Sequence, residues 1–135
     1  VMTMRANGAY TCLVSGGFTL FTARIAAMLG FDENRANELV VADGRLTGEV
    51  REPILGKEAK RATLIELRER LGLAPEETLA LGDGANDLAM LGEAGLGVAF
   101  RAKPAVAAAA HARLDHSDLT ALLYLQGYRD DAFVR

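Results

Sequence analysis

Short apolar runs alternate with amphipathic segments along this chain. Residues 9–14, 78–82 and 95–100 are β-prone and short, which is typical of buried strands. Residues 19–29 and 57–71 repeat apolar side chains at helical spacing, and each segment is followed by a glycine that can end a helix. Strands that alternate with helices predict an α/β domain with a mainly parallel sheet.

Weaker signals complete the predicted order of elements. Asp43-Gly44 lies between apolar residues 39–41 and 46–47, which predicts a hairpin. The remaining expectations are a helix end at Asn7-Gly8, helices over 85–92 and 103–112, a short strand at 113–115, and a helix over 119–127 capped by Ser117-Asp118. Because no repeat or linker interrupts the pattern, residues 1–135 are expected to form a single domain, the C-terminal portion of a longer protein.

Composition narrows the partners more than the chemistry. The 135 residues carry a net charge of −3, which gives no reason to expect nucleic acid or an anionic membrane as a partner. No apolar run approaches the ~18 residues of a membrane span, so a cytoplasmic protein is expected. Cys12 is the one cysteine and lies in an apolar run, which predicts a buried thiol.

Two predicted strand ends carry polar groups and glycine. In parallel sheets the ligand site lies at the carboxyl ends of the strands. After the strand at 78–82, Asp83 and Asp87 bring two carboxylates together, and these repel one another unless a cation or a proton lies between them. Carboxylate oxygens at a strand end suit Mg²⁺. The alternative is a turn with a helix cap, where Asp and Asn are common for local reasons.

A phosphate site is the second candidate. After the strand at 9–14, Ser15 followed by Gly16 can offer a hydroxyl and backbone N–H groups to an anion at a helix N-terminus, or simply cap that helix. Lys60 lies over the middle of the apolar stripe of its helix and Lys57 lies near the edge, so Lys60 is predicted to point into a site rather than to solvent. The dinucleotide, P-loop and nucleophile-elbow motifs are all incomplete, and His111 and His116 are predicted to be surface residues.

Together, "VSGGF", Lys60 and "GDGANDLAML" resemble the haloacid-dehalogenase-type phosphatases, and "DGRLTGEV" and "AGLGVAFRAKP" resemble the branch that acts on phosphoserine. The resemblance covers residues 5–125 and implies a three-layer Rossmann-like core. It implies Mg²⁺-dependent hydrolysis of phosphoserine through an aspartyl phosphate, in the last step of serine biosynthesis.

The resemblance also implies a role for each matching residue. Ser15 and the Gly16 backbone would bind phosphate, as would Asn86. Lys60 would neutralise the charge of the phosphate and of the nucleophile. Asp83 would be a Mg²⁺ ligand, and Asp87 would support the metal shell through water.

One departure from the family pattern is large. The family's nucleophile is the first Asp of a D-x-D-x-[ST] motif on the central strand, and these residues contain no D-x-D and no cap. The sheet would therefore lack the strand between those at 9–14 and 78–82, leaving two unpaired edges. Three situations are open: an upstream segment carries that strand, a second chain such as a homo-oligomer partner supplies it, or the two flanking strands pair directly in an inactive sheet.

Three functions follow from these features. The first is part of a phosphoserine phosphatase that is inactive as this chain alone. The second is a phosphatase for another small phosphate ester, because the absent cap is expected to set the substrate. The third is a non-catalytic fragment that binds phosphate or Mg²⁺, which the absence of D-x-D favours.

Overall fold

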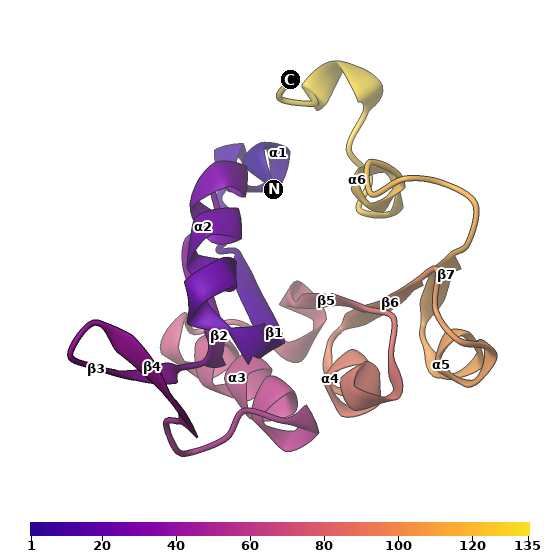
Figure 1. The fold of residues 1–135 in the computed structure, drawn as a ribbon. Coiled ribbons are helices and arrows are strands. Elements are labelled where there is room, and N and C mark those ends of the chain that lie inside the picture. Colours follow the sequence, from indigo (N-terminus) through magenta and orange to yellow (C-terminus); the bar gives the residue numbers. More distant parts are fainter. The chain divides into compact units, whose positions relative to one another are not determined.

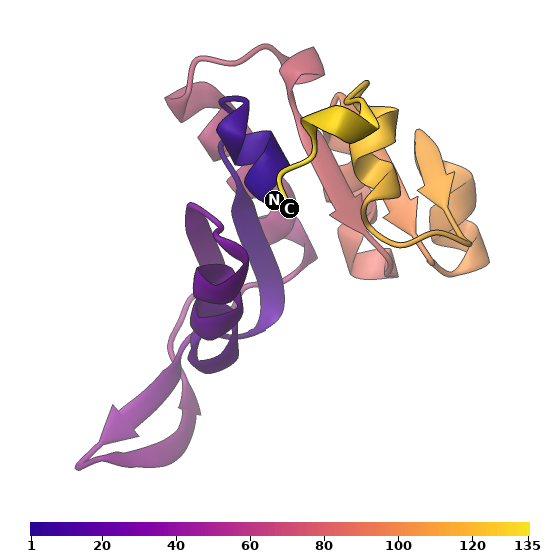
Figure 2. The same ribbon diagram turned by 90° about the horizontal axis from the view of Figure 1, so that it is seen from above.

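The computed structural model describes residues 1–135, and the chain divides into two compact units. The first unit comprises Val1–Leu55 and Tyr128–Arg135, and the second comprises Gly56–Gly127. Figures 1 and 2 show the elements of both units, coloured along the chain from the N-terminus to the C-terminus. Each helix is either too short or too polar to span a membrane.

The first unit is built on a parallel β-α-β arrangement. Its elements are α1 (Met2–Ala6), β1 (Cys12–Phe18), α2 (Thr19–Leu29), β2 (Glu33–Asn37), β3 (Leu39–Ala42), β4 (Arg45–Val50) and the short 3₁₀ helix η3 (Asp130–Ala132). Strands β1 and β2 pair in parallel, and α2 connects them and packs on both. The buried Thr3 hydroxyl accepts a hydrogen bond from the Val134 N–H at 2.8 Å, which fastens the C-terminal residues to α1.

The hairpin and the ends of α2 follow from local sequence. Asp43 and Gly44 both have positive φ, 52° and 74°, the backbone that a tight hairpin turn requires, and β3 pairs antiparallel with β4 around them. Helix α2 ends at Gly30, whose φ of 82° is left-handed and suits glycine. Both predictions are confirmed.

The second unit is a three-layer α/β structure. It contains α3 (Lys57–Arg70), η1 (Pro75–Glu77), β5 (Leu79–Gly82), η2 (Ala85–Asp87), α4 (Leu88–Glu93), β6 (Leu96–Phe100), α5 (Pro104–Ala109), β7 (Ala112–Leu114) and α6 (Ala121–Leu125). Strands β5, β6 and β7 form a parallel sheet in that order. Figure 1 shows α4 and α5 on one face of this sheet and α6 on the other. The core gathers small and branched apolar side chains: Ala80, Leu91, Ala94, Ala99, Val106 and Ala107.

The parallel α/β class is confirmed, and several details differ from the sequence prediction. Strand β1 starts later than predicted and continues through Ser15-Gly16-Gly17, which was predicted to follow the strand. Strand β2 was not predicted, because the polar sequence ENRAN has no strand-like alternation. The predicted helix over 85–92 is a 3₁₀ turn followed by α4, and α6 begins later than predicted, after a turn in which Asp118 accepts the Thr120 N–H.

Two further expectations are corrected. Cys12 is half-buried rather than buried, because it starts a strand that has a ladder partner on one side only. The third open situation, direct pairing between the strands predicted at 9–14 and 78–82, is not found, since β1 pairs with β2 and β5 pairs with β6. Each of these sheets therefore ends on a strand with one unpaired edge.

Glycine is required where β6 passes under α4. A Cβ added at Gly97 would lie 2.1 Å from the backbone oxygen of Leu91, whereas a Cβ added at Gly92 in α4 would meet nothing within 4 Å. Gly97→Ala is expected to destabilise the chain by about 3 kcal/mol through overpacking. Gly92→Ala is expected to stabilise it by up to about 1 kcal/mol, because alanine favours the helix.

Urea denaturation followed by circular dichroism measures both effects. Equal stabilities of the two variants would contradict the close packing of β6 against α4.

Candidate active site

A buried ion pair organises the polar end of β5. The Nζ of Lys60, on α3, lies 2.7 Å from Oδ1 of Asp87, and the two residues are only 7% and 5% exposed. Lys60 therefore points inward, as the helical stripe predicted, while Lys57 is exposed. A charge pair so far removed from water is retained only with close geometry and further hydrogen bonds.

Asp87 supplies those further bonds through its second oxygen. Oδ2 accepts the backbone N–H groups of Asp83 at 3.0 Å and of Gly84 at 3.2 Å. Burial raises the pKa of Asp87. The Lys60 hydrogen bond and the two backbone N–H groups lower it by a larger amount, so the pKa of Asp87 lies below its ordinary value. Asp87 is thus ionised at neutral pH, and both of its oxygens are occupied within the protein.

The glycines of "GDGAND" make this arrangement possible. A Cβ at Gly82 would lie 2.5 Å from the Cβ of Asp87 and 2.6 Å from its Oδ2. A Cβ at Gly84 would lie 2.8 Å from Oδ1 of Asn86. The prediction of a close backbone approach at these glycines is confirmed, because a larger residue at either position would displace a polar side chain.

Asp83 and Asn86 face outward from the same loop. Both side chains are exposed, and neither makes a hydrogen bond or an ion pair within the protein. No group of three or more His, Cys, Asp or Glu residues gathers into a cation site. The loop therefore offers one free carboxylate and one free amide beside a charge pair that is already satisfied.

The second polar strand end lies in the first unit. Between the pairs Val14↔Arg35 and Phe18↔Asn37, three residues of β1 oppose one residue of β2, so Ser15-Gly16-Gly17 forms an irregular bulge. The Ser15 hydroxyl accepts the Gly17 N–H at 2.9 Å. The Ser15 side chain is half-buried, and Gly16 and Gly17 are exposed. The sequence placed these residues in a turn before the helix, but the strand continues through them, and α2 begins at Thr19 as predicted.

Asn37 fixes this bulge and was not identified from the sequence. It is buried, its Nδ2 donates to the Gly16 carbonyl at 3.0 Å, and its Oδ1 accepts the Leu55 N–H at 2.6 Å. A single asparagine at the end of a polar stretch carries no sequence signal for this role. His111 and His116 are exposed, as predicted. Nδ1 of His111 accepts the Gly97 N–H at 2.8 Å.

Comparison with known proteins defines the class of this site. The family model for haloacid dehalogenase-like hydrolases matches residues 2–92, and the chain belongs to that family. Phosphoserine phosphatase from Haemophilus influenzae is 42% identical over 130 residues, which cover 96% of this chain and 41% of that protein.

Solved structures agree with this assignment. A probable phosphoserine phosphatase from Vibrio cholerae superposes with a TM-score of 0.89 at 35% identity, covering 92% of this chain and 38% of that one. A phosphoserine phosphatase described as a phospho-aspartyl intermediate analogue superposes with a TM-score of 0.83 at 38% identity, covering 92% and 59%. The chain thus spans between 38% and 59% of the length of these relatives.

The ion pair between Lys60 and Asp87 gives a direct energetic prediction. Lys60→Met or Asp87→Asn alone should destabilise the second unit by about 3 kcal/mol, because each leaves a buried charge unpaired. The double variant should lose less than the sum of the two single losses, with a coupling energy of at least about 1 kcal/mol at pH 7.

The pH dependence of that coupling is its control. Because the folded state lowers the pKa of Asp87, its stabilising contribution is present above the ordinary pKa and is lost as pH falls through the lowered value. The coupling should therefore disappear in strong acid. Additive losses at pH 7, measured by urea denaturation, would contradict the pairing.

Proposed function

We propose that this chain carries the metal-binding and phosphate-binding part of a Mg²⁺-dependent phosphatase that hydrolyses phosphoserine. The observation that carries the proposal is the buried Lys60–Asp87 pair beneath a loop whose Asp83 carboxylate is exposed and unpartnered. The identity with phosphoserine phosphatases supports the same substrate. On this proposal the protein is cytoplasmic and acts in the last step of serine biosynthesis.

The donor set fits Mg²⁺ as far as these residues go. Mg²⁺ binds through one or two carboxylates, keeps several water molecules and often contacts substrate phosphate. Asp83 would supply the carboxylate. Asp87 would support the metal site through water rather than bind the cation directly, because both of its oxygens already accept hydrogen bonds. When bound, the cation would neutralise charge on the phosphate oxygens.

The other predicted residues would hold the phosphate. The Asn86 amide is free to donate from the same loop as Asp83. Ser15 and the Gly16 backbone would bind phosphate oxygens from the bulge that Asn37 fixes. Lys60 would place positive charge close to the transferring group while remaining paired with Asp87.

Phosphoryl transfer needs a nucleophile that these residues do not contain. The proposed route is transfer to an aspartate of a D-x-D-x-[ST] segment, followed by hydrolysis of the aspartyl phosphate. The solved relative described as a phospho-aspartyl intermediate analogue supports that route. An upstream segment or a second chain would supply the aspartate and its strand, so the 135 residues alone are expected to be inactive.

The absence of D-x-D also favours a second candidate, a non-catalytic fragment that binds phosphate or Mg²⁺. A third candidate function is a phosphatase with the same chemistry that acts on another small phosphate ester instead of phosphoserine. A screen of phosphomonoesters against the active assembly would separate it from phosphoserine hydrolysis.

Titration with Mg²⁺ tests the metal site. Isothermal titration calorimetry should show saturable binding by the wild-type chain and at least about tenfold weaker binding by Asp83→Asn, since one ligand charge is lost. Asp131→Asn is the matched control, because it removes the same charge from an exposed residue of the first unit. Equal affinities of all three proteins would refute Asp83 as a ligand.

A further inference from the structure

The loop between β6 and α5 lies against the loop that carries Asp83. Strands β5 and β6 are parallel neighbours, so their carboxyl ends lie at the same edge of the sheet. The backbone N–H of Lys103 donates to the Asp83 carbonyl at 3.4 Å. The side chains of Lys103 and Asp83 are both exposed, and the Lys103 ammonium makes no hydrogen bond or ion pair.

The charges at this edge do not balance a bound phosphate ester. Lys60 is paired with Asp87 at 2.7 Å, so this pair contributes no net charge. Asp83 with one divalent cation would leave a single positive charge, whereas a phosphate monoester carries about −1.5 to −2 at pH 7. One more positive charge within reach would bring this sum close to zero, and Lys103 is the lysine whose backbone contacts Asp83.

Arg101 fixes the loop that presents Lys103. Its φ is +45°, a left-handed backbone that is uncommon for a residue other than glycine and persists where surrounding contacts hold it. Its N–H donates to the Leu114 carbonyl at 2.8 Å, and its guanidinium donates to the Ser117 carbonyl at 2.9 Å. The guanidinium also lies 5.3 Å from the centre of the Phe100 ring, within cation–π range.

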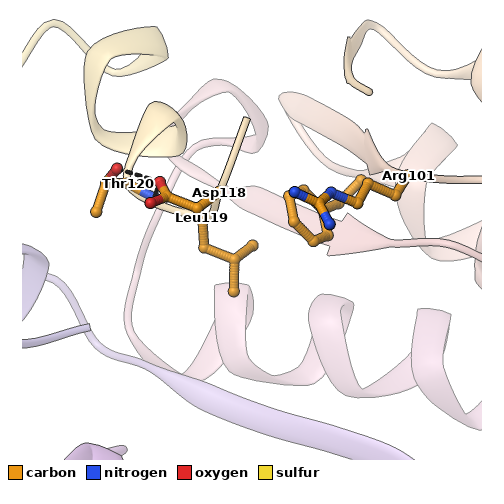
Figure 3. A pocket seen from close by; sticks show the side chains of 5 residues that line it. Arg101, Asp118, Leu119 and Thr120 are labelled. Carbon is orange, nitrogen blue, oxygen red and sulfur yellow. Dashed lines mark hydrogen bonds between the residues drawn. The ribbon is translucent and has the colours of Figure 1, made fainter. Parts of the chain in front are cut away.

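Figure 3 shows the Arg101 side chain on one side of a pocket and Asp118 with Thr120 on the other. Since the Arg101 guanidinium is held by Ser117 and by the Phe100 ring, it serves the loop rather than a ligand near Asp83. At the other end of the loop, Lys103 precedes α5, whose first residue is Pro104, so its backbone is fixed while its side chain is free.

We propose that Lys103 binds the phosphate group of the substrate beside Asp83, and that Arg101 is a positioning residue that holds the Lys103 backbone in place. This proposal rests on the proposed function, because it requires phosphate at the Asp83 loop. It adds a second lysine, whose charge is not already paired within the protein.

Calorimetric titration with inorganic phosphate, at saturating Mg²⁺, tests the proposal. Lys103→Gln should weaken phosphate binding about tenfold through the loss of one nearby charge, and Lys103→Arg should restore most of it. Arg101→Ala should weaken binding about threefold, since the loop loses its anchors. Arg70→Gln is the charge-matched control, because Arg70 ends α3 about 15 Å along the helix from Lys60, and its affinity should stay within about twofold of wild type.

The outcomes separate this proposal from the one on which it rests. Wild-type binding that needs Asp83 but is equal in Lys103→Gln would overturn the role of Lys103 and leave the phosphatase site intact. Equal losses in Lys103→Gln and Arg70→Gln would show a general charge effect and would also overturn it. No phosphate binding by the wild-type chain would count against the proposed function itself and would remove the basis for a role of Lys103. Far-UV circular dichroism of each variant checks that the fold is kept.

Discussion

The buried charge pair between Lys60 and Asp87 is the constraint on which the second unit depends. It joins α3 to the loop after β5, and the other oxygen of Asp87 holds two consecutive backbone N–H groups of that loop. Gly82 leaves the space that the Asp87 side chain occupies. As a result the loop has a fixed course, and the Asp83 carboxylate is left exposed at the carboxyl end of the strand. Such a pair is costly to bury, so a cluster that keeps a carboxylate beside it is characteristic of a site with chemistry to perform.

The first unit uses the same principle with neutral groups. Asn37 is buried, and its amide binds the Gly16 carbonyl and the Leu55 N–H. These bonds fix an irregular strand segment in which Ser15 accepts the Gly17 N–H. In each unit a buried polar side chain therefore satisfies the backbone of a glycine-rich loop or bulge and fixes its course. Membership of the haloacid dehalogenase-like hydrolases is consistent with both arrangements.

The sequence predicted much of this, and the limits have physical causes. Helices α2 and α3 were predictable because apolar spacing and terminal glycines are local signals, and the inward direction of Lys60 followed from its place on the helical stripe. Strand β2 was not, because its polar residues pair with β1 through backbone groups that leave no side-chain pattern. The roles of Asn37 and Arg101 depend on contacts with residues far along the chain, such as Gly16 and Ser117. The glycines of "GDGAND" were recognised as sites of close approach, but only the structure shows that Asp87 fills the space beside Gly82.

Release of phosphate from phosphoserine measures whether this chain supplies the metal-binding and phosphate-binding part of a phosphatase. The mass of the 135-residue chain would first be confirmed. In the presence of Mg²⁺, the chain would then be assayed both by itself and mixed with a polypeptide that carries the D-x-D-x-[ST] segment of a related phosphatase. We expect no turnover by the chain alone and Mg²⁺-dependent turnover by the mixture, which is lost when the chain carries Lys60→Met. Turnover by the chain alone would refute the proposed function of this chain, because these residues would then contain a nucleophile that the proposed site lacks. Turnover by the mixture that is unchanged by Lys60→Met would contradict the role given to the buried pair.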